Sequence, residues 1–164
     1  MSVQTPVQIA WVTRDLRATE SALTGLLGAK KWVRMRDVHF GPENCEYRGR
    51  PADFHAHISL SYAGDTQLEV IEPVDGASIY TEFLDHGGPG LHHVCMRADG
   101  RAGLAAAVAD ATAQGAEVVA RGVMPGGMEF AYVAAPDAGV PFIEIAHIPA
   151  DIEAFFDHIK QEQA

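Results

Sequence analysis

The sequence predicts an α+β fold built from two tandem βαβββ modules. Segments with strand-like alternation and segments with helical periodicity follow one another in the order β-α-β-β-β, and this order occurs twice. The two halves also overlay at nearly constant shifts, as an internal repeat requires. A length of 164 residues and a hydrophobic content of 48% suit one domain with its own core. We expect module one at about residues 5–75, module two at about 90–148 and a C-terminal helix at about 150–162.

The first module begins with a strand and an amphipathic helix. Residues 7–13 alternate as a strand does, and residues 15–29 place leucines at helical spacing before Gly28, a typical C-terminal stop. Three more strands follow, and the polar segment 40–53 between the first two of them is expected to be a loop. Their ranges are 30–38, 54–62 and 66–73, and a tight turn joins the last two.

The second module repeats this order after a connector, residues 75–89, which is expected to hold one short helix. A strand comes first, then an alanine-rich helix that stops at Gly115, and then three more strands. The expected elements are the strand 91–98, the helix 100–116 and the strands 117–123, 128–135 and 140–147.

Four polar side chains occupy equivalent positions in the two modules. Gln8 overlays His93 at a shift of 85 residues and Glu69 overlays Glu144 at a shift of 75, and the difference matches an insertion within 40–53. Because strand side chains alternate, each of the four lies opposite the apolar side chains that we expect to pack under the helices. One such polar residue on a half-buried strand is ordinary, but the same position used four times favours a shared site.

The chemistry of these four side chains suits a divalent metal ion. Glu69 and Glu144 offer carboxylates, His93 offers an imidazole and Gln8 an amide oxygen, which leaves coordination positions for water or substrate. His92 is expected on the helix-packed face, as a hydrogen-bonded, partly buried histidine. The sequence therefore predicts His93 as the ligand of this adjacent pair.

The tight turn near residue 64 decides which further side chains join the site. If this turn pairs Leu60 with Leu68, then His55 and His57 point to the same side as Glu69. His57 is then the candidate for a second acid/base group.

Composition argues against several kinds of partner. The chain has 12 basic and 22 acidic residues, a net charge of −10 and no large basic cluster, so we do not expect nucleic acid as a partner. It has no apolar run of membrane-spanning length and no N-terminal segment that pairs a basic start with an apolar stretch, so we expect neither membrane spanning nor secretion. Its two cysteines form neither a disulfide framework nor a zinc pattern, which points to a reducing cytoplasm.

The segments GLHHVCM (90–96) and LEVIEP (68–73) resemble those of methylmalonyl-CoA epimerases and glyoxalase-I-like proteins, which belong to the vicinal oxygen chelate superfamily. The resemblance implies that the modules close into a cup-shaped mixed sheet with the helices outside, around one divalent metal ion. Zinc is the expected ion, with nickel, cobalt or manganese as alternatives, and a homodimer is expected. The family's ligand positions fall on Gln8, Glu69, His93 and Glu144.

The function expected from this site is a metal-dependent isomerase, epimerase or lyase acting on a small-molecule carbonyl substrate. Glu144 is the expected base, which removes a proton next to the carbonyl, and His57 is the expected second acid/base. His55, Cys95 and Met128 are the expected substrate-binding residues. Two alternatives stay open: a metal-free, drug-sequestering binding protein, and an extradiol-type dioxygenase, which the single histidine among the four ligands disfavours.

Overall fold

The described chain, residues 5–164 of this computed structural model, contains the two predicted series of elements. The first series consists of β1 (Thr5–Val12), α1 (Leu16–Leu27), β2 (Val33–Phe40), β3 (Cys45–Tyr47), β4 (Arg50–Pro51), β5 (Phe54–Ala63) and β6 (Thr66–Asp75). After α2 (Ile79–Asp85), the second consists of β7 (Gly90–Arg97), α3 (Gly100–Ala113), β8 (Val118–Val123), β9 (Glu129–Ala134) and β10 (Phe142–His147), followed by α4 (Ala150–Gln161).

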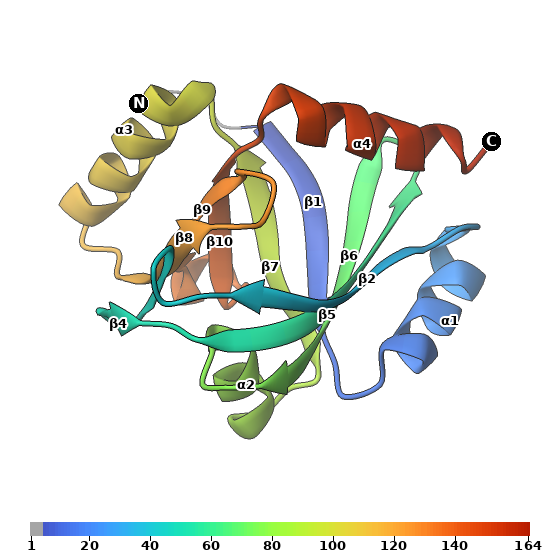
Figure 1. Ribbon diagram of the computed structural model, residues 1–164, viewed down its shortest axis with the longest axis horizontal. Coiled ribbons are helices and arrows are strands. Elements are labelled where there is room, and N and C mark those ends of the chain that lie inside the picture. Colours follow the sequence, from blue (N-terminus) through green and yellow to red (C-terminus); the bar gives the residue numbers. More distant parts are fainter. Residues whose placement is uncertain (1–4) are drawn as a thin grey trace.

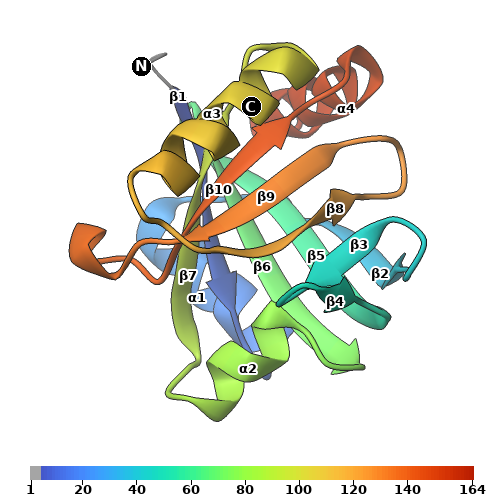
Figure 2. The same cartoon turned by 90° about the vertical axis from the view of Figure 1, so that its left-hand side faces the viewer.

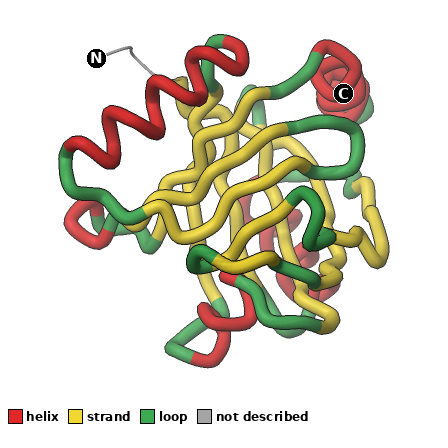
Figure 3. The backbone as a smooth tube through the Cα atoms, turned by 60° about the vertical axis from the view of Figure 1, so that its left-hand side comes forward, coloured by secondary structure: helices red, strands yellow, loops and turns green. Residues whose placement is uncertain are grey.

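All ten strands belong to one mixed sheet, which curls into a cup (Figure 1). The order across the sheet is β2-β5-β6-β1-β7-β10-β9-β8-β3-β4. The strands occupy the middle of the molecule and the helices lie around them (Figure 3), with α3 across β9 and β10 on the outside of the second module (Figure 2). The α+β cup expected from the sequence is therefore confirmed.

Helix α1 covers the outer face of the first module because its ends and its apolar side are specified locally. The Asp15 side chain caps the first turn, and Gly28 ends the helix in the left-handed conformation, with φ of 77°. Leu16 and Leu23 lie on the side that packs against Val70 of β6. This packing leaves the opposite face of β6 for the interior of the cup.

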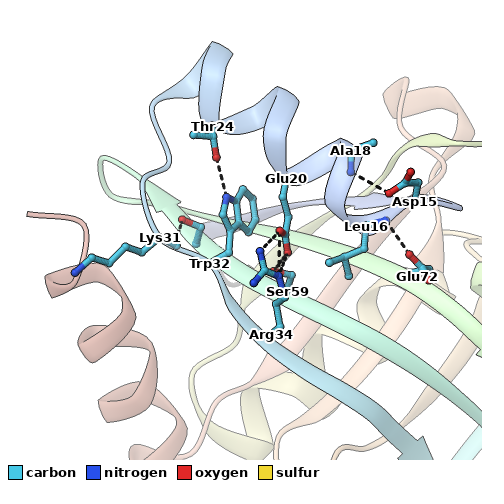
Figure 4. Close-up of polar contacts among 11 residues, drawn as sticks. Asp15, Leu16, Ala18, Glu20, Thr24, Lys31, Trp32, Arg34, Ser59 and Glu72 are labelled. Atoms are coloured by element: carbon cyan, nitrogen blue, oxygen red, sulfur yellow. Dashed lines mark hydrogen bonds and ion pairs between the residues drawn. The ribbon is translucent and has the colours of Figure 1, made fainter.

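A buried carboxylate joins α1 to the sheet (Figure 4). Glu20 accepts hydrogen bonds from the Arg34 guanidinium of β2, including one of 2.8 Å from Nε, and from the Ser59 hydroxyl of β5 at 2.6 Å. The Glu20 side chain is buried and the Arg34 side chain is about one-third exposed. The bonds therefore compensate the desolvation of Glu20.

Replacing Glu20 with alanine is expected to lower the free energy of unfolding by about 2–4 kcal/mol, because Arg34 and Ser59 lose their shared acceptor. Denaturant unfolding measures this loss. The matched control is Glu162→Ala, which removes the exposed ion pair with Lys31 and should cost less than about 1 kcal/mol. Equal losses in the two variants would contradict the role given to Glu20.

The segment 40–53 is not the loop that the sequence predicts. Strand β3 pairs antiparallel with β8 of the second module, and β4 pairs with β3. Cys45 is buried in the main core, which explains why this polar segment is held against the sheet. The insertion thus extends the sheet at the edge of the second module.

The register of β5 and β6 differs by one residue from the predicted one. The turn at residues 64–65 pairs Ala63 with Thr66, so Leu60 lies opposite Glu69 and not opposite Leu68. Because side chains alternate along a strand, a shift of one residue moves every side chain of β5 to the other face. The cup side of β5 therefore carries Phe54, Ala56, Ile58 and Leu60, and both predicted histidines lie on the outer face.

Strand β7 contains a β-bulge at its two histidines. Ala10 of β1 pairs with His93, but the next residue, Trp11, pairs with Leu91, so His92 is the extra residue. A bulge interrupts the alternation of side chains. The expectation that His92 packs under the helices is therefore wrong: its ring lies inside, with its Nδ1 2.8 Å from Nδ1 of His93.

Helix α4 lies along one rim of the cup (Figure 1). Ile159 is fully buried in the main core, and Ile152 and Phe156 pack against a cluster that contains Cys95 and Met128. Among the described residues, no helix is long and apolar enough to cross a membrane. The cytoplasmic location and the homodimer stay predictions.

Candidate metal centre

Three of the four predicted ligands converge inside the cup. One ligand atom each from Glu69 on β6, His93 on β7 and Glu144 on β10 lies within 4.8 Å of the other two. Nε2 of His93 is 3.5 Å from Oε1 of Glu69 and 3.0 Å from Oε2 of Glu144. All three residues are buried. Two carboxylates and an imidazole nitrogen thus face one another out of contact with bulk water.

The repeat explains why these side chains meet. In the first module, Glu69 pairs with Ala10, two residues after Gln8; in the second, Glu144 pairs with Cys95, two residues after His93. The two parallel strand pairs therefore have the same register. Since β1 and β7 are neighbours in the sheet, the equivalent positions of both modules lie side by side.

The fourth predicted ligand, Gln8, is buried on β1 beside Cys95. Its Nε2 donates a 2.6 Å hydrogen bond to Oε1 of Gln67. Its Oε1 is buried and accepts no hydrogen bond from the described residues. The amide oxygen is thus the free end of the side chain.

The unpartnered atoms fit a bound cation. Oε1 of Gln8 is buried without a hydrogen-bond partner among the described residues, and the contacts of His93 Nε2 there are its ion pairs with Glu69 and Glu144. Buried polar atoms without partners are costly. A divalent ion would satisfy both atoms and neutralise the carboxylates of Glu69 and Glu144, which are ligands that such ions accept.

The electrostatics of the site favour a positive charge at its centre. Burial by itself would lower the pKa of His93, but the contacts with Glu144 and Glu69 outweigh burial and raise the pKa to about 9. Burial raises the pKa of Glu69 above its ordinary value, and the charge of Glu144 adds to this. Without a metal ion, the proton on His93 supplies the positive charge at neutral pH.

The neighbouring titratable groups stay neutral. Burial raises the pKa of Cys95, Tyr80 and Tyr132 well above the ordinary values, and the carboxylates raise it further. Burial and the charge of His93 lower the pKa of His92 well below its usual value. None of these four neighbours therefore adds a charge to the site.

The histidines predicted on β5 do not reach this cluster. His57 accepts a hydrogen bond at Nδ1 from the Asp37 backbone at 3.0 Å, and Nδ1 of His55 lies 2.8 Å from the Asp75 carboxylate. Both lie on the outer face because of the one-residue difference in register. The structure therefore contradicts the acid/base position expected for His57 and the substrate-binding position expected for His55.

Two cavities lie next to the ligands. The larger, of about 170 Å³, lies between Gln8, Gln67 and Tyr62 on one side and α4 on the other, and Cys95 and Met128 also line it. A smaller space of about 10 Å³ borders Glu69 and Glu144, which is room for about one water molecule. Met128 lines both cavities. Cys95 and Met128 thus line a cavity beside the proposed ligands, and their role in substrate binding stays a prediction.

Sequence reasoning missed two residues that contact the ligands. Gln67 is two residues before Glu69 and therefore on the same face, so the alternation that identified Glu69 also marks Gln67. His92 had no such signal, because a regular strand would have placed it on the opposite face.

A family model described as Glyoxalase/Bleomycin resistance protein/Dioxygenase superfamily matches residues 7–132 of the chain. The search of curated proteins with this chain found no match. Among solved structures, a hypothetical protein from Bacillus halodurans C-125 has a TM-score of 0.63 at 15% identity, covering 89% of this chain and 95% of the other.

Two epimerase structures are also similar. The methylmalonyl-CoA epimerase from Mycobacterium tuberculosis has a TM-score of 0.60 at 19% identity, covering 93% of this chain and 94% of the other. A variant of the Streptomyces coelicolor enzyme, solved with 2-nitronate-propionyl-CoA, has the same score and identity and covers 89% and 98%. At these identities the likeness shows the fold alone. The family match, which spans more than half of the sequence, shows that the chain belongs to the Glyoxalase/Bleomycin resistance protein/Dioxygenase superfamily.

Proposed function

We propose that the protein is a divalent-metal-dependent isomerase, epimerase or lyase that removes a proton next to a carbonyl group. The observation that carries this proposal is the buried convergence of Glu69, His93 and Glu144, together with the free amide oxygen of Gln8. These four residues would hold the ion. Zinc is the first candidate and nickel, cobalt or manganese are alternatives, because one nitrogen and three oxygen ligands suit several of these ions.

A divalent ion bound there would supply Lewis-acid stabilisation of the negative charge that develops on the carbonyl oxygen. We assign Glu144 as the base that takes the proton from the adjacent carbon, since its carboxylate borders the small space beside the ligands. Glu69 borders the same space from β6, on the other side of β1 and β7. In place of His57, Glu69 is therefore the candidate that returns the proton.

The larger cavity is the proposed place of the substrate. Its volume of about 170 Å³ is below the roughly 300–1,000 Å³ typical of sites for drug-sized ligands. A small carbonyl compound, or the acyl end of a larger one, fits this volume. Cys95 and Met128 would supply apolar surface for it, and Gln8, the fourth proposed ligand, lines the same cavity.

Metal content tests the proposal most directly. Protein purified without added metal is expected to contain about one divalent ion per chain, and Glu69→Ala and His93→Ala are expected to lose it, because each removes a ligand. Elemental mass spectrometry measures the content. His57→Ala is the matched control, since this histidine lies outside the cup and its loss should leave the ion bound.

Two outcomes would count against the proposal. If the protein contains no metal, and added zinc, nickel, cobalt or manganese does not raise its melting temperature, the site is not a metal centre and a metal-free binding protein becomes the better reading. If His57→Ala loses the ion as completely as His93→Ala does, the ligand set is wrong.

A further inference from the structure

Two of the proposed ligands, Gln8 and His93, each contact a polar side chain through the atom that does not face the proposed ion. Gln8 donates from Nε2 to Oε1 of Gln67 at 2.6 Å, and Nδ1 of His93 lies 2.8 Å from Nδ1 of His92. In each case the contact occupies one end of the ligand side chain. The opposite end, Oε1 of Gln8 or Nε2 of His93, has no hydrogen-bond partner among the described residues.

We infer that Gln67 and His92 are positioning residues that select which atom Gln8 and His93 present to the metal ion. The inference rests on the proposed metal centre and extends it to two residues that do not bind the ion. An amide can present oxygen or nitrogen, and an imidazole can carry its proton on either nitrogen. A cation requires the oxygen of the amide and the unprotonated nitrogen of the imidazole.

The histidine pair selects the tautomer of His93. In a neutral imidazole, one nitrogen is a donor and the other an acceptor. If Nδ1–H of His93 donates to Nδ1 of His92, Nε2 of His93 keeps its lone pair and faces Glu69 and Glu144. Neutral histidines that bind metal ions through one nitrogen usually donate from the other in this way.

The packing around His92 fixes the orientation of its ring. Its ring is fully buried and lies with its centroid 5.3 Å from Tyr80, 5.1 Å from Phe83 and 4.9 Å from Phe142. With Nδ1 accepting, its proton is on Nε2, and the Ile79 backbone is the polar group that contacts the ring besides His93. The bulge in β7 is what brings the two rings to one side.

Gln67 selects the orientation of the Gln8 amide in a similar way. Oε1 of Gln67 accepts from Gln8, and Nε2 of Gln67 donates to the Tyr62 hydroxyl at 3.2 Å. In this arrangement Tyr62 contacts the amide nitrogen of Gln67, and the acceptor end of Gln67 faces Gln8. The Gln8 nitrogen is thereby bound, and its oxygen is left free.

The test for His92 compares a variant without an acceptor with one that keeps an acceptor near the position of Nδ1. His92→Leu is expected to weaken Co²⁺ binding by about 10–100-fold, and His92→Asn by no more than about threefold. Titration followed by the visible absorption of Co²⁺ measures both. In the zinc-bound wild type, ¹⁵N NMR is expected to show the His93 proton on Nδ1, a signature that a merely structural role does not require.

The test for Gln67 follows the same design. Gln67→Leu removes the acceptor of Gln8 Nε2 and is expected to weaken Co²⁺ binding by about 10-fold or more. Gln67→Glu keeps an acceptor at this position and is expected to bind Co²⁺ about as tightly as the wild type. Tyr62→Phe removes the donor contact behind Gln67 and should have a smaller effect than Gln67→Leu.

The outcomes separate this inference from the proposed function. If the wild type binds no Co²⁺, the metal centre itself is refuted. If the wild type binds it, and His92→Leu and Gln67→Leu bind it equally well, the metal centre stands and the positioning role is refuted. If His92→Leu does not fold, the NMR measurement on the wild type decides, since a His93 proton on Nε2 would overturn the role of His92.

Discussion

Replacing Glu144 with glutamine is expected to abolish turnover and leave the fold intact. A glutamine oxygen can still face the metal ion, but the amide cannot take a proton from carbon at neutral pH. Loss of a positioned base typically costs about 10²–10⁴-fold in rate. The glutamine has nearly the same volume, so the packing beside Cys95 and His93 should change little.

The measurement is exchange of the acidic C–H proton in heavy water, followed by proton NMR. The panel consists of small 2-oxo and 2-hydroxy carbonyl compounds and methylmalonyl-CoA, with which a structurally similar methylmalonyl-CoA epimerase was solved in complex. Circular dichroism and metal content report whether fold and ion survive. His57→Ala is the control and should keep wild-type exchange, because this side chain bonds to the Asp37 backbone outside the cup. Wild-type exchange by Glu144→Gln would refute Glu144 as the base.

Metal affinity is expected to rise about tenfold per pH unit between pH 6 and 8. The contacts with Glu144 and Glu69, against the opposing effect of burial, raise the pKa of His93 to about 9. An ion must therefore displace one proton from His93 throughout this range, and each unit of pH lowers the cost of doing so by about 1.4 kcal/mol. Calorimetric titration in buffers with different ionisation enthalpies measures both the affinity and the released proton.

The stability of the metal-free protein is expected to fall as pH rises, whereas the metal affinity rises. The folded-state pKa of His93 lies above its ordinary value near 6.5, so this group stabilises the fold fully below about pH 6.5 and loses that contribution as pH rises through about 9. Glu69, whose pKa burial also raises, acts in the same direction at lower pH. Thermal unfolding of the chelator-treated protein at several pH values checks the sign.

His93→Gln is the matched variant for both measurements. It removes the titrating group, so the pH dependence of metal-free stability should flatten in the interval from about 6.5 to 9. Where the glutamine oxygen still binds the ion, the weaker metal affinity should also depend less on pH. A metal affinity of the wild type that does not depend on pH would show that His93 is neutral before the ion binds, contrary to the expectation from its two carboxylate contacts.

The alternation of side chains along single strands was enough to predict most residues of the candidate site. Gln8, Glu69, His93 and Glu144 were identified from the faces of their own strands and from the repeat, and neither requires knowledge of how the strands pair. The cluster of Glu69, His93 and Glu144 in the structure agrees with this reasoning. The same reasoning applies to Gln67, which shares the face of Glu69.

The sequence by itself therefore determined the order of the elements and the strand faces that carry the proposed ligands, because alternation with a period of two is a local property. The closure of the two modules into a cup was what the family resemblance implied. Only the tertiary structure decided the one-residue register of β5 against β6, which moves His57 outside, and the bulge that turns His92 inside. Strand β3 likewise pairs with a strand of the other module. Register and bulges depend on packing between strands distant in sequence, which periodicity within one strand does not encode.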